Sequence, residues 1–164
     1  MKHIYIRTSK IHGFGVSIGE NVKKGEIIAR IKGKMRFKVN KTTKDTFANP
    51  DWVGVAKDQW IDPDKPYKFL NHSCNPSAGI KGRVTLIALK NMKEGEEVTI
   101  DYSTVEGDPH WQMECICGEK TCRKIIKSVE FMPAEQFKKY LPYVPSYFKK
   151  LYMKRYKKLK TALI

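Results

Sequence analysis

The chain has 164 residues, of which 41% are hydrophobic and 30% are charged. This length and composition are typical of one folded domain and exclude a wholly disordered chain, a collagen-like repeat and a multidomain architecture. The net charge of +15 at pH 7, from 32 basic and 17 acidic side chains, indicates a nucleic acid, an anionic surface or an acidic protein as a partner.

The N-terminal residues carry no signal for export. They lack the apolar stretch and the small-residue cleavage site of a secretory signal. The longest apolar runs, such as residues 85–89, are strand-sized and far shorter than the ~20 residues that cross a bilayer. We therefore expect an intracellular protein without a membrane span, in the cytoplasm or, in a eukaryotic cell, at nuclear chromatin.

Most of residues 1–102 shows the pattern of short strands separated by turns. A turn at Lys24-Gly25 leads into a predicted strand that ends near Ile31, and proline-rich loops bracket a second strand over residues 52–61. A third strand over residues 83–89 is followed by a turn and by a fourth strand over residues 97–102. This part of the chain is therefore predicted to be mainly β.

After Cys122 the pattern becomes helical. Residues 133–141 predict a short helix with proline in its first turn, and a second helix begins near Ser146. One stripe of the second helix is apolar, and lysines cover much of the rest. The stripe consists of Phe148, Leu151, Tyr152, Tyr156, Leu159 and Leu163. We expect the stripe to pack on the β domain, which leaves the lysines exposed.

The positive charge is concentrated in this C-terminal part. From residue 123 onwards the chain carries 12 basic and two acidic residues, which account for +10 of the total charge. Such a segment is compatible with binding to a nucleic acid, and equally with a solvated face that only improves solubility.

The four cysteines are Cys74, Cys115, Cys117 and Cys122, and the last three lie within eight residues in the pattern CxCx4C. In a reducing compartment, four thiolates are the soft ligands that tetrahedral zinc prefers. Disulfides in an oxidising compartment and free structural thiols are the alternatives.

Two further motifs complete an ordered set with the cysteines: NHSCNP at residues 71–76 and GEEVTIDY at residues 95–102, preceded by GFG at residues 13–15. This set resembles the SET-domain family of protein lysine methyltransferases, including its post-SET zinc segment. The resemblance spans residues 11–127. It implies the SET (β-clip) fold of small curved sheets, with residues 71–76 threaded in a pseudoknot-like arrangement through a loop around residues 98–102.

The resemblance also implies a division of the chain. Residues 1–102 would form the SET domain, residues 103–127 the post-SET zinc segment and residues 128–164 a basic extension of C-terminal α-helices. S-adenosylmethionine and one structural zinc ion would be the cofactors.

The resemblance further implies roles for individual residues. Tyr102 would be the catalytic residue, with its hydroxyl at the mouth of a narrow channel for the target lysine. The cofactor would be bound by Gly13, Phe14, Gly15, Asn71, His72, Tyr102 and Trp111, and the zinc by Cys74, Cys115, Cys117 and Cys122. Tyr67, Phe69 and Trp111 would line the channel or cover the cofactor. Without the resemblance, the glycines fit a plain turn and the aromatic residues fit a core.

The chain departs from the family pattern at two places. Lys68-Phe69 stands where the family often has Arg-Phe, which keeps the charge. Ile100 stands where family members use an aromatic residue that helps to set how many methyl groups are added. Isoleucine cannot anchor a water molecule, so we expect space for more than one methyl group.

These observations favour an enzyme that methylates lysine side chains of a protein, either a histone or another basic protein, with S-adenosylmethionine as the methyl donor. One alternative is an inactive SET-fold module that attaches to nucleic acid or chromatin through its basic helix. Another is a zinc-ribbon nucleic-acid binder, which leaves the two motifs unexplained. Acidic residues are expected to form a substrate-facing patch, and they are Asp58, Asp62, Asp64, Glu106 and Asp108.

Overall fold

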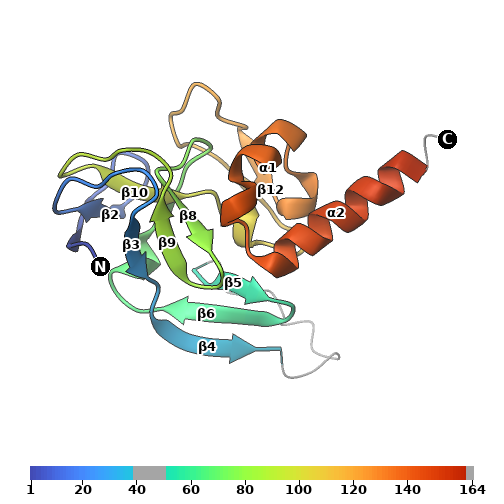
Figure 1. Cartoon of the computed structure of the whole chain (residues 1–164), viewed down its shortest axis with the longest axis horizontal. Coiled ribbons are helices and arrows are strands. Elements are labelled where there is room, and N and C mark those ends of the chain that lie inside the picture. The colour runs from blue at the N-terminus through green and yellow to red at the C-terminus, as the bar shows by residue number, and fades with distance from the viewer. Residues whose placement is uncertain (39–50, 162–164) are drawn as a thin grey trace.

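The computed structural model describes residues 1–38 and 51–161, with side chains as far as Lys157. Within these residues, twelve short strands form four small sheets, and a helical arm follows them at the C-terminal end (Figure 1). The predicted fold class, a mainly β body of small sheets with C-terminal helices, is confirmed.

The first sheet has the strand order β1-β2-β10-β7. Its strands are β1 (Ile4–Thr8), β2 (Phe14–Ile18), β7 (Asn71–His72) and β10 (Glu97–Ile100). The central strands β2 and β10 pair antiparallel, whereas β10 and β7 pair parallel, with Thr99 opposite Asn71 and Ile100 opposite His72. This parallel pair places the first residues of the NHSCNP motif beside the end of the GEEVTIDY motif.

Two three-stranded sheets and one two-stranded sheet complete the body, in the orders β3-β9-β8, β4-β6-β5 and β11-β12. Their bounds are β3 (Ile27–Arg30), β4 (Gly33–Phe37), β5 (Val53–Ala56), β6 (Gln59–Pro63), β8 (Ala78–Lys81), β9 (Thr85–Ala88), β11 (Gln112–Glu114) and β12 (Ile125–Lys127). The predicted strands near residues 27–31, 83–89 and 97–102 correspond to β3, β9 and β10.

The prediction of one strand over residues 52–61 is wrong, because this segment is a hairpin made of β5 and β6. The chain reverses at Lys57-Asp58, and Asp58 adopts a φ of 53°, a left-handed conformation that aspartate tolerates better than most residues. The reversal directs Asp58 towards the C-terminal arm, where it lines a cavity discussed below.

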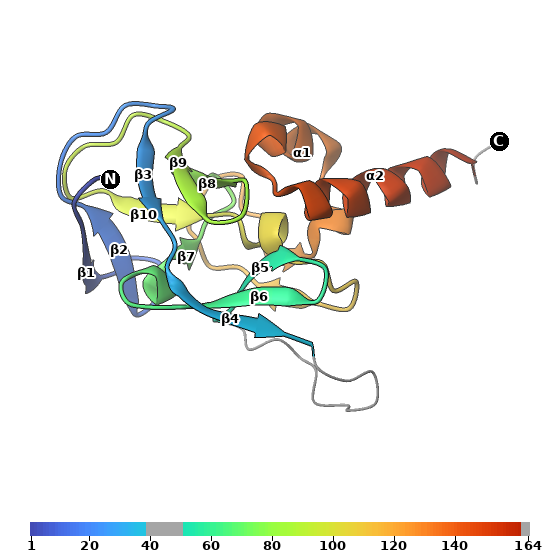
Figure 2. The ribbon, with the colours of Figure 1, turned by 60° about the horizontal axis from the view of Figure 1, so that its bottom comes forward.

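The C-terminal arm consists of α1 (Ala134–Tyr140), a 3-10 turn over Leu141–Tyr143 and α2 (Ser146–Thr161). α2 begins against the β body and then projects away from it, as both views show (Figures 1 and 2). No helix among the described residues combines the length and apolar character that crossing a membrane demands.

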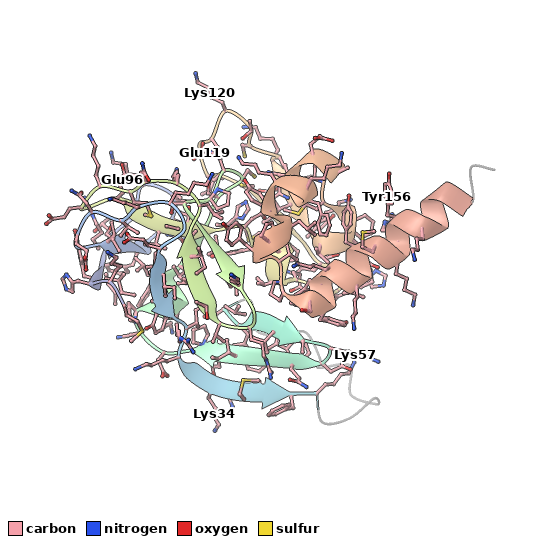
Figure 3. All side chains as sticks on the ribbon, viewed as in Figure 1. Lys34, Lys57, Glu96, Glu119, Lys120 and Tyr156 are labelled. Carbon is pink, nitrogen blue, oxygen red and sulfur yellow. The ribbon has the colours of Figure 1, made fainter. Side chains whose placement is uncertain are left out.

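The predicted apolar stripe of α2 is buried only near the start of the helix. Phe148 and Tyr152 are buried, and the Tyr152 ring stacks on Phe137 of α1 with 3.6 Å between ring centroids. Tyr156, one turn further on, is 41% exposed and is visible on the projecting part of the helix (Figure 3). The side chains of Leu159 and Leu163 lie outside the described residues.

One hydrophobic core joins the sheets to the arm. Strands β2, β3, β9 and β10 contribute fully buried aliphatic side chains, and α1 and α2 add aromatic ones. The largest of these buried side chains include Phe148, Ile18, Ile28, Ile80, Leu86 and Ile100. Because the core reaches from the first sheet to α2, it fixes the positions of the loops that run between them.

Candidate functional site

Tyr102 lies at the point where β10 ends and the chain turns into a short 3-10 segment, Tyr102–Val105. The Asp101 carboxylate starts this turn by accepting a hydrogen bond from the Ser103 backbone N–H at 3.1 Å. The turn directs the half-buried Tyr102 ring back over the sheet, where its hydroxyl donates a hydrogen bond to the Leu70 carbonyl at 2.7 Å.

Burial, assisted by the negative charges of Asp51 and Glu97, raises the pKa of Tyr102 to about 12. The side chain is therefore a neutral phenol at any physiological pH. Because its single proton is donated to the Leu70 carbonyl, the lone pairs of the phenol oxygen remain available to accept a hydrogen bond from another group.

Two cavities adjoin at Tyr102. The first, which we call the narrow cavity, has a volume of about 70 Å³. Its lining residues are Asp51, Trp52, Val53, Tyr67, Lys68, Leu70, Ile100, Tyr102, Val105, Glu106 and Trp111. A cavity walled largely by aromatic and aliphatic side chains suits the aliphatic stem of a long side chain.

The second, which we call the cysteine-side cavity, has a volume of about 210 Å³. Its lining residues are Ile11, His12, Asn71, His72, Tyr102, Met113, Glu114, Cys115, Ile116 and Cys117. Tyr102 lines both cavities, so groups bound in the two cavities would meet at its side chain.

Asn71 holds the loop at the edge of the cysteine-side cavity. Its side-chain amide donates to the carbonyls of His12 and Phe14, at 3.3 and 3.0 Å, and to the Glu97 carboxylate at 2.8 Å. A Cβ atom at Gly15 would collide with the same carboxylate. A larger residue at position 15 would therefore displace the Glu97 carboxylate from its hydrogen bond with Asn71, and Asn71 holds the carbonyls of His12 and Phe14 in place.

His72 links the Tyr102 backbone to a cysteine. The Tyr102 backbone N–H donates to His72 Nδ1 at 3.2 Å, and His72 Nε2 lies 3.3 Å from Cys74 Sγ. Burial, together with the nearby Arg123 cation, lowers the pKa of His72 to about 3, so the ring is neutral. Since Nδ1 accepts a hydrogen bond, the single ring proton is on Nε2 and points to the sulfur.

The cysteines gather beside this cavity, and none of the four forms a disulfide. Ligand atoms of His72, Cys74, Cys115 and Cys117 all lie within 4.8 Å of one another, and the sulfurs of Cys74 and Cys115 are 3.8 Å apart. A tetrahedral zinc ion with Zn–S bonds of about 2.3 Å requires sulfur pairs about 3.8 Å apart. The chemistry and spacing of these thiols therefore fit zinc.

Cys122 packs against the same cluster, but it is not one of the four residues whose ligand atoms lie within 4.8 Å of one another. Its thiol donates to the Cys115 carbonyl at 3.4 Å and lies within hydrogen-bonding reach of the Cys115 and Cys117 thiols. The proton on His72 Nε2 disqualifies that nitrogen as a ligand, because a metal-binding nitrogen must offer a lone pair. Cys122 is thus the better fourth ligand.

Arg123, which follows the last cysteine, ties the cluster to the strand that carries Tyr102. Its guanidinium donates to the fully buried Asp101 carboxylate at 2.6 Å and to the Ser103 hydroxyl at 3.2 Å. Its backbone N–H and its Nε both lie 3.4 Å from Cys74 Sγ. Burial raises the pKa of Asp101, and the Arg123 cation opposes that rise.

The remaining cofactor residues expected from the sequence occupy different places. Gly13 adopts a φ of 49° in the loop before β2, next to His12 of the cysteine-side cavity. Phe14 is 58% exposed and packs edge-on against Phe69. Trp111 lines the narrow cavity rather than the cysteine-side cavity and packs against the cysteine cluster.

Several residues that build this site were not predicted from the sequence. Arg123 carried a signal, since it directly follows CxCx4C, but its ion pair with Asp101 joins residues 22 positions apart. Leu70 contributes only a backbone carbonyl, and Glu97 contributes a carboxylate behind the loop. A backbone carbonyl is present in every residue, and a supporting carboxylate needs no fixed spacing from its partner, so a single sequence does not identify either one.

Three comparisons with known proteins bear on this geometry. A family model described as SET domain matches residues 13–103. The chain is 27% identical over 159 residues to the H3 lysine-9 specific histone-lysine N-methyltransferase KMT1 of Fusarium mangiferae, which covers 70% of this chain and 45% of that protein. It is likewise 27% identical over 164 residues to the H3 lysine-9 specific enzyme dim-5 of Neurospora crassa, covering 73% of this chain and 50% of that protein.

The chain therefore spans about half the length of these two curated relatives. Among solved structures, a crystal structure of KRYPTONITE in complex with mCHG DNA and SAH matches with a TM-score of 0.60 and 25% identity, over 76% of this chain and 29% of that chain. A structure of ctPRC2 bound to S-adenosylmethionine also matches, with a TM-score of 0.52 and 17% identity over 63% of this chain and 15% of that chain. At this low identity, the match supports only the similarity of the fold.

Proposed function

Since the chain belongs to the SET-domain family, we propose that it transfers a methyl group from S-adenosylmethionine to the side-chain amine of a lysine in a protein. The observation that carries this proposal is that Tyr102 lines both the narrow cavity and the cysteine-side cavity. Relatives named as histone-lysine methyltransferases, and a similar structure that holds SAH, support it.

The cysteine-side cavity would hold the methyl donor. When bound there, S-adenosylmethionine supplies an electrophilic methyl group on a sulfonium. Asn71 and His72 line this cavity, and His12 of its lining is followed by Gly13 and by the first two residues of β2, Phe14 and Gly15. The Glu114 carboxylate in its lining suits a ligand that carries positive charge.

The narrow cavity would hold the target lysine. A lysine amine with an ordinary pKa of about 10.4 is almost wholly protonated at pH 7 and cannot act as a nucleophile. Trp52, Tyr67, Leu70 and Ile100 give the cavity apolar walls, and burial of the amine against these walls would disfavour its ammonium form. The proton can then leave to solvent before transfer, without a dedicated strong base.

Tyr102 would orient the amine for transfer. Its hydroxyl proton is held by the Leu70 carbonyl, so its oxygen accepts a hydrogen bond from the amine and fixes the direction of the nitrogen lone pair. A phenol whose pKa is raised to about 12 does not serve as the base. Trp111 serves the lysine in this scheme, because it lines the narrow cavity.

We further propose one structural zinc ion. Its ligands would be Cys74 of the NHSCNP motif and three cysteines of residues 103–127, namely Cys115, Cys117 and Cys122. With four protein ligands the ion leaves no position for water, so its role would be structural. It would hold residues 115–117 in place as a wall of the cysteine-side cavity.

The substrate is proposed to be a basic protein, such as a histone or another protein bound to nucleic acid, inside the cell. The relatives named above are H3 lysine-9 specific enzymes, and the similar KRYPTONITE structure is a complex with DNA. The basic extension over residues 128–164 would contact the nucleic acid. The inactive-module alternative is not favoured, because the Tyr102 hydroxyl and both cavities are in place.

Transfer of radiolabelled methyl groups from S-adenosylmethionine to lysate proteins tests this proposal. We expect methyl-lysine, identified by mass spectrometry, with the wild-type protein and at least about 100-fold less with Tyr102→Phe, since orientation of the reacting groups is lost. Tyr143→Phe removes a hydroxyl from a residue that lines neither the narrow nor the cysteine-side cavity, so it should retain activity. Equal labelling by Tyr102→Phe and the wild type would refute the assigned role.

A further inference from the structure

A third cavity adjoins the narrow cavity and is larger than it, with a volume of about 470 Å³. Val105, Glu106 and Trp111 line both. We propose that this third cavity, the flanking cavity, binds a positively charged side chain next to the target lysine, so that the protein selects lysines with a neighbouring arginine or lysine. The inference rests on the proposed function, because it takes the narrow cavity as the lysine site.

The flanking cavity is acidic in a strongly basic protein. Among the residues that the structure describes, its lining includes the carboxylates of Asp58, Glu106 and Asp108 and one ammonium group, that of Lys38. The chain as a whole carries +15, so a local excess of negative charge distinguishes this place from most of the surface. A cation would be attracted here and an acidic side chain repelled.

Aromatic rings form the other walls of the flanking cavity. Trp60, Trp111, Tyr147 and Phe148 line it, and cations bind over the faces of such rings, arginine more often than lysine. Burial raises the pKa of Tyr147, and the negative charges of Asp58, Glu130 and Glu106 raise it further, which places carboxylates near this ring. Rings beside carboxylates are the surroundings that suit a guanidinium group.

Three separate parts of the chain build this cavity. Asp58 and Trp60 come from the β5-β6 hairpin, residues 106–111 form a loop after Tyr102, and Tyr147 and Phe148 begin α2. Lys57, beside Asp58, marks the hairpin turn below the start of α2 (Figure 3). The α2 wall lies outside the matched family segment, residues 13–103, whereas Asp58 and Trp60 lie within it.

The shared lining limits which substrate residue reaches the flanking cavity. An extended chain advances about 3.3 Å per residue and alternates its side chains. Because the two cavities share part of their lining, they are adjacent, and we expect the side chain in the flanking cavity to come from a residue close to the target lysine, within about three positions along an extended substrate. Asp62 and Asp64, which the sequence suggested as part of the same patch, are not in its lining, and Asp62 instead pairs with Arg36.

Peptides with one central lysine test this inference. Each position within three residues of the lysine is occupied in turn by arginine, alanine or glutamate in an otherwise neutral sequence. Methyl transfer and peptide binding by fluorescence anisotropy are measured for the wild type, for Asp58→Asn/Asp108→Asn and for Asp64→Asn. The last variant removes an exposed carboxylate outside the cavity and serves as the matched control.

We expect arginine to be preferred over glutamate by at least about tenfold at one or more positions, a difference worth about 1.4 kcal/mol. The preference should fall to less than about threefold in Asp58→Asn/Asp108→Asn and persist in Asp64→Asn. Methylation with equal rates for all three residues would overturn the inference while the proposed function stands. If no peptide is methylated, the anisotropy measurement still tests the arginine preference. Peptide binding without such a preference would overturn the inference.

Discussion

Asp101 and Tyr102 are adjacent residues with different tasks, and a single buried ion pair connects them to the cysteine cluster. Tyr102 places its hydroxyl between two cavities, whereas Asp101 is fully buried and pairs with Arg123 at 2.6 Å. The second oxygen of Asp101 has no hydrogen-bond partner among the described residues. Asp101 therefore depends on Arg123 for charge compensation, and this pair holds the segment after Cys122 against the turn that carries Tyr102.

Replacing Arg123 with methionine should destabilise the protein strongly. An uncompensated buried carboxylate costs about 3 kcal/mol or more, so we expect the free energy of unfolding to fall by at least that amount in denaturant titrations of the zinc-loaded protein. The double variant Asp101→Asn/Arg123→Met should lose less than the sum of the two single variants, because it leaves no unpaired charge. A loss below about 1 kcal/mol for Arg123→Met would contradict this account.

Ile100 is fully buried in the lining of the narrow cavity and offers no hydroxyl. We predict that the wild type adds more than one methyl group to a lysine and that Ile100→Tyr shifts the product towards monomethyl-lysine, since its hydroxyl can hold a water molecule where further methyl groups would lie. Mass spectrometry of a methylated peptide measures this. Ile100→Phe adds a ring without the hydroxyl and is the control; identical product distributions for all three proteins would refute the prediction.

At the scale of residues, the sequence motifs pointed to individual candidate residues, but not to the contacts that those residues make in the fold. Tyr102 and Asn71 were identified from their motifs, and the structure brings both to the cysteine-side cavity. The partnership of Asn71 with Glu97 requires the parallel pairing of β7 and β10, which periodicity does not reveal. Trp111 was expected to bind the cofactor or to line the lysine channel, and it lies in the lining of the narrow cavity.

At the scale of elements, the segment from Trp111 to Lys127 owes its position to the cysteines. Strands β11 and β12 have three residues each, and β11 is exposed along its whole length. Such a short exposed ribbon is marginal by itself, so it requires an additional constraint such as a metal ion. The same segment supplies one wall of the cysteine-side cavity.

Two variants distinguish the possible sets of metal ligands. We expect one zinc ion per chain in the wild type. Cys122→Ser should weaken zinc binding by at least about tenfold. His72→Asn should retain zinc, because the protonated Nε2 of His72 is not a ligand. Metal content by mass spectrometry and competition with a chelator measure this. Retention of zinc in Cys122→Ser with loss in His72→Asn would assign the fourth ligand to His72.

Helices and hydrophobic strands were predicted better than hairpins. The helix near residues 133–141 appears as α1, and the one near Ser146 appears as α2 with the same first residue. The β5-β6 hairpin escaped prediction because its turn, Lys57-Asp58, contains no glycine, asparagine or proline. β11 lacks the buried alternate positions from which a strand is recognised, so nothing in its sequence revealed it.

At the scale of the whole molecule, the carboxylates of the flanking cavity and the lysines of the C-terminal arm come from different parts of the chain. The start of α2 contributes the uncharged residues Tyr147 and Phe148 to the flanking cavity, whereas Lys150 and Lys154, further along the helix, are exposed. The later turns of α2 project away from the β body (Figure 1). This separation allows a basic protein to bind a basic substrate, because the substrate and the positive charge of the arm lie at different places.

We predict that the arm binds double-stranded DNA with strong salt dependence. Each lysine that contacts a phosphate adds about 0.9 to the slope of log K against log salt, so Lys150→Gln/Lys154→Gln should reduce the slope by about two. Anisotropy titrations at several salt concentrations measure this. Lys34→Gln/Lys81→Gln, which removes exposed charges from the sheets, is the control, and an equal reduction in both double variants would contradict a role for α2.

The sequence predicted the whole-molecule family and class but not the spatial relation between sites. Motif order sufficed for the SET resemblance, and local periodicity sufficed for the mainly β body and the helices. The flanking cavity forms where the hairpin, the loop after Tyr102 and α2 come together, and the core that holds these parts involves contacts distant in sequence. Such contacts are set by tertiary packing, which local patterns do not specify.

Tyr102 is proposed to separate a cofactor site from a lysine site, and a crystal structure with S-adenosylhomocysteine and a lysine peptide would show where each ligand binds. We predict that the cofactor sulfur lies in the cysteine-side cavity and the lysine amine in the narrow cavity, with both facing the Tyr102 hydroxyl from opposite sides. A complex with both ligands in one cavity, or with the lysine amine away from Tyr102, would contradict the claim.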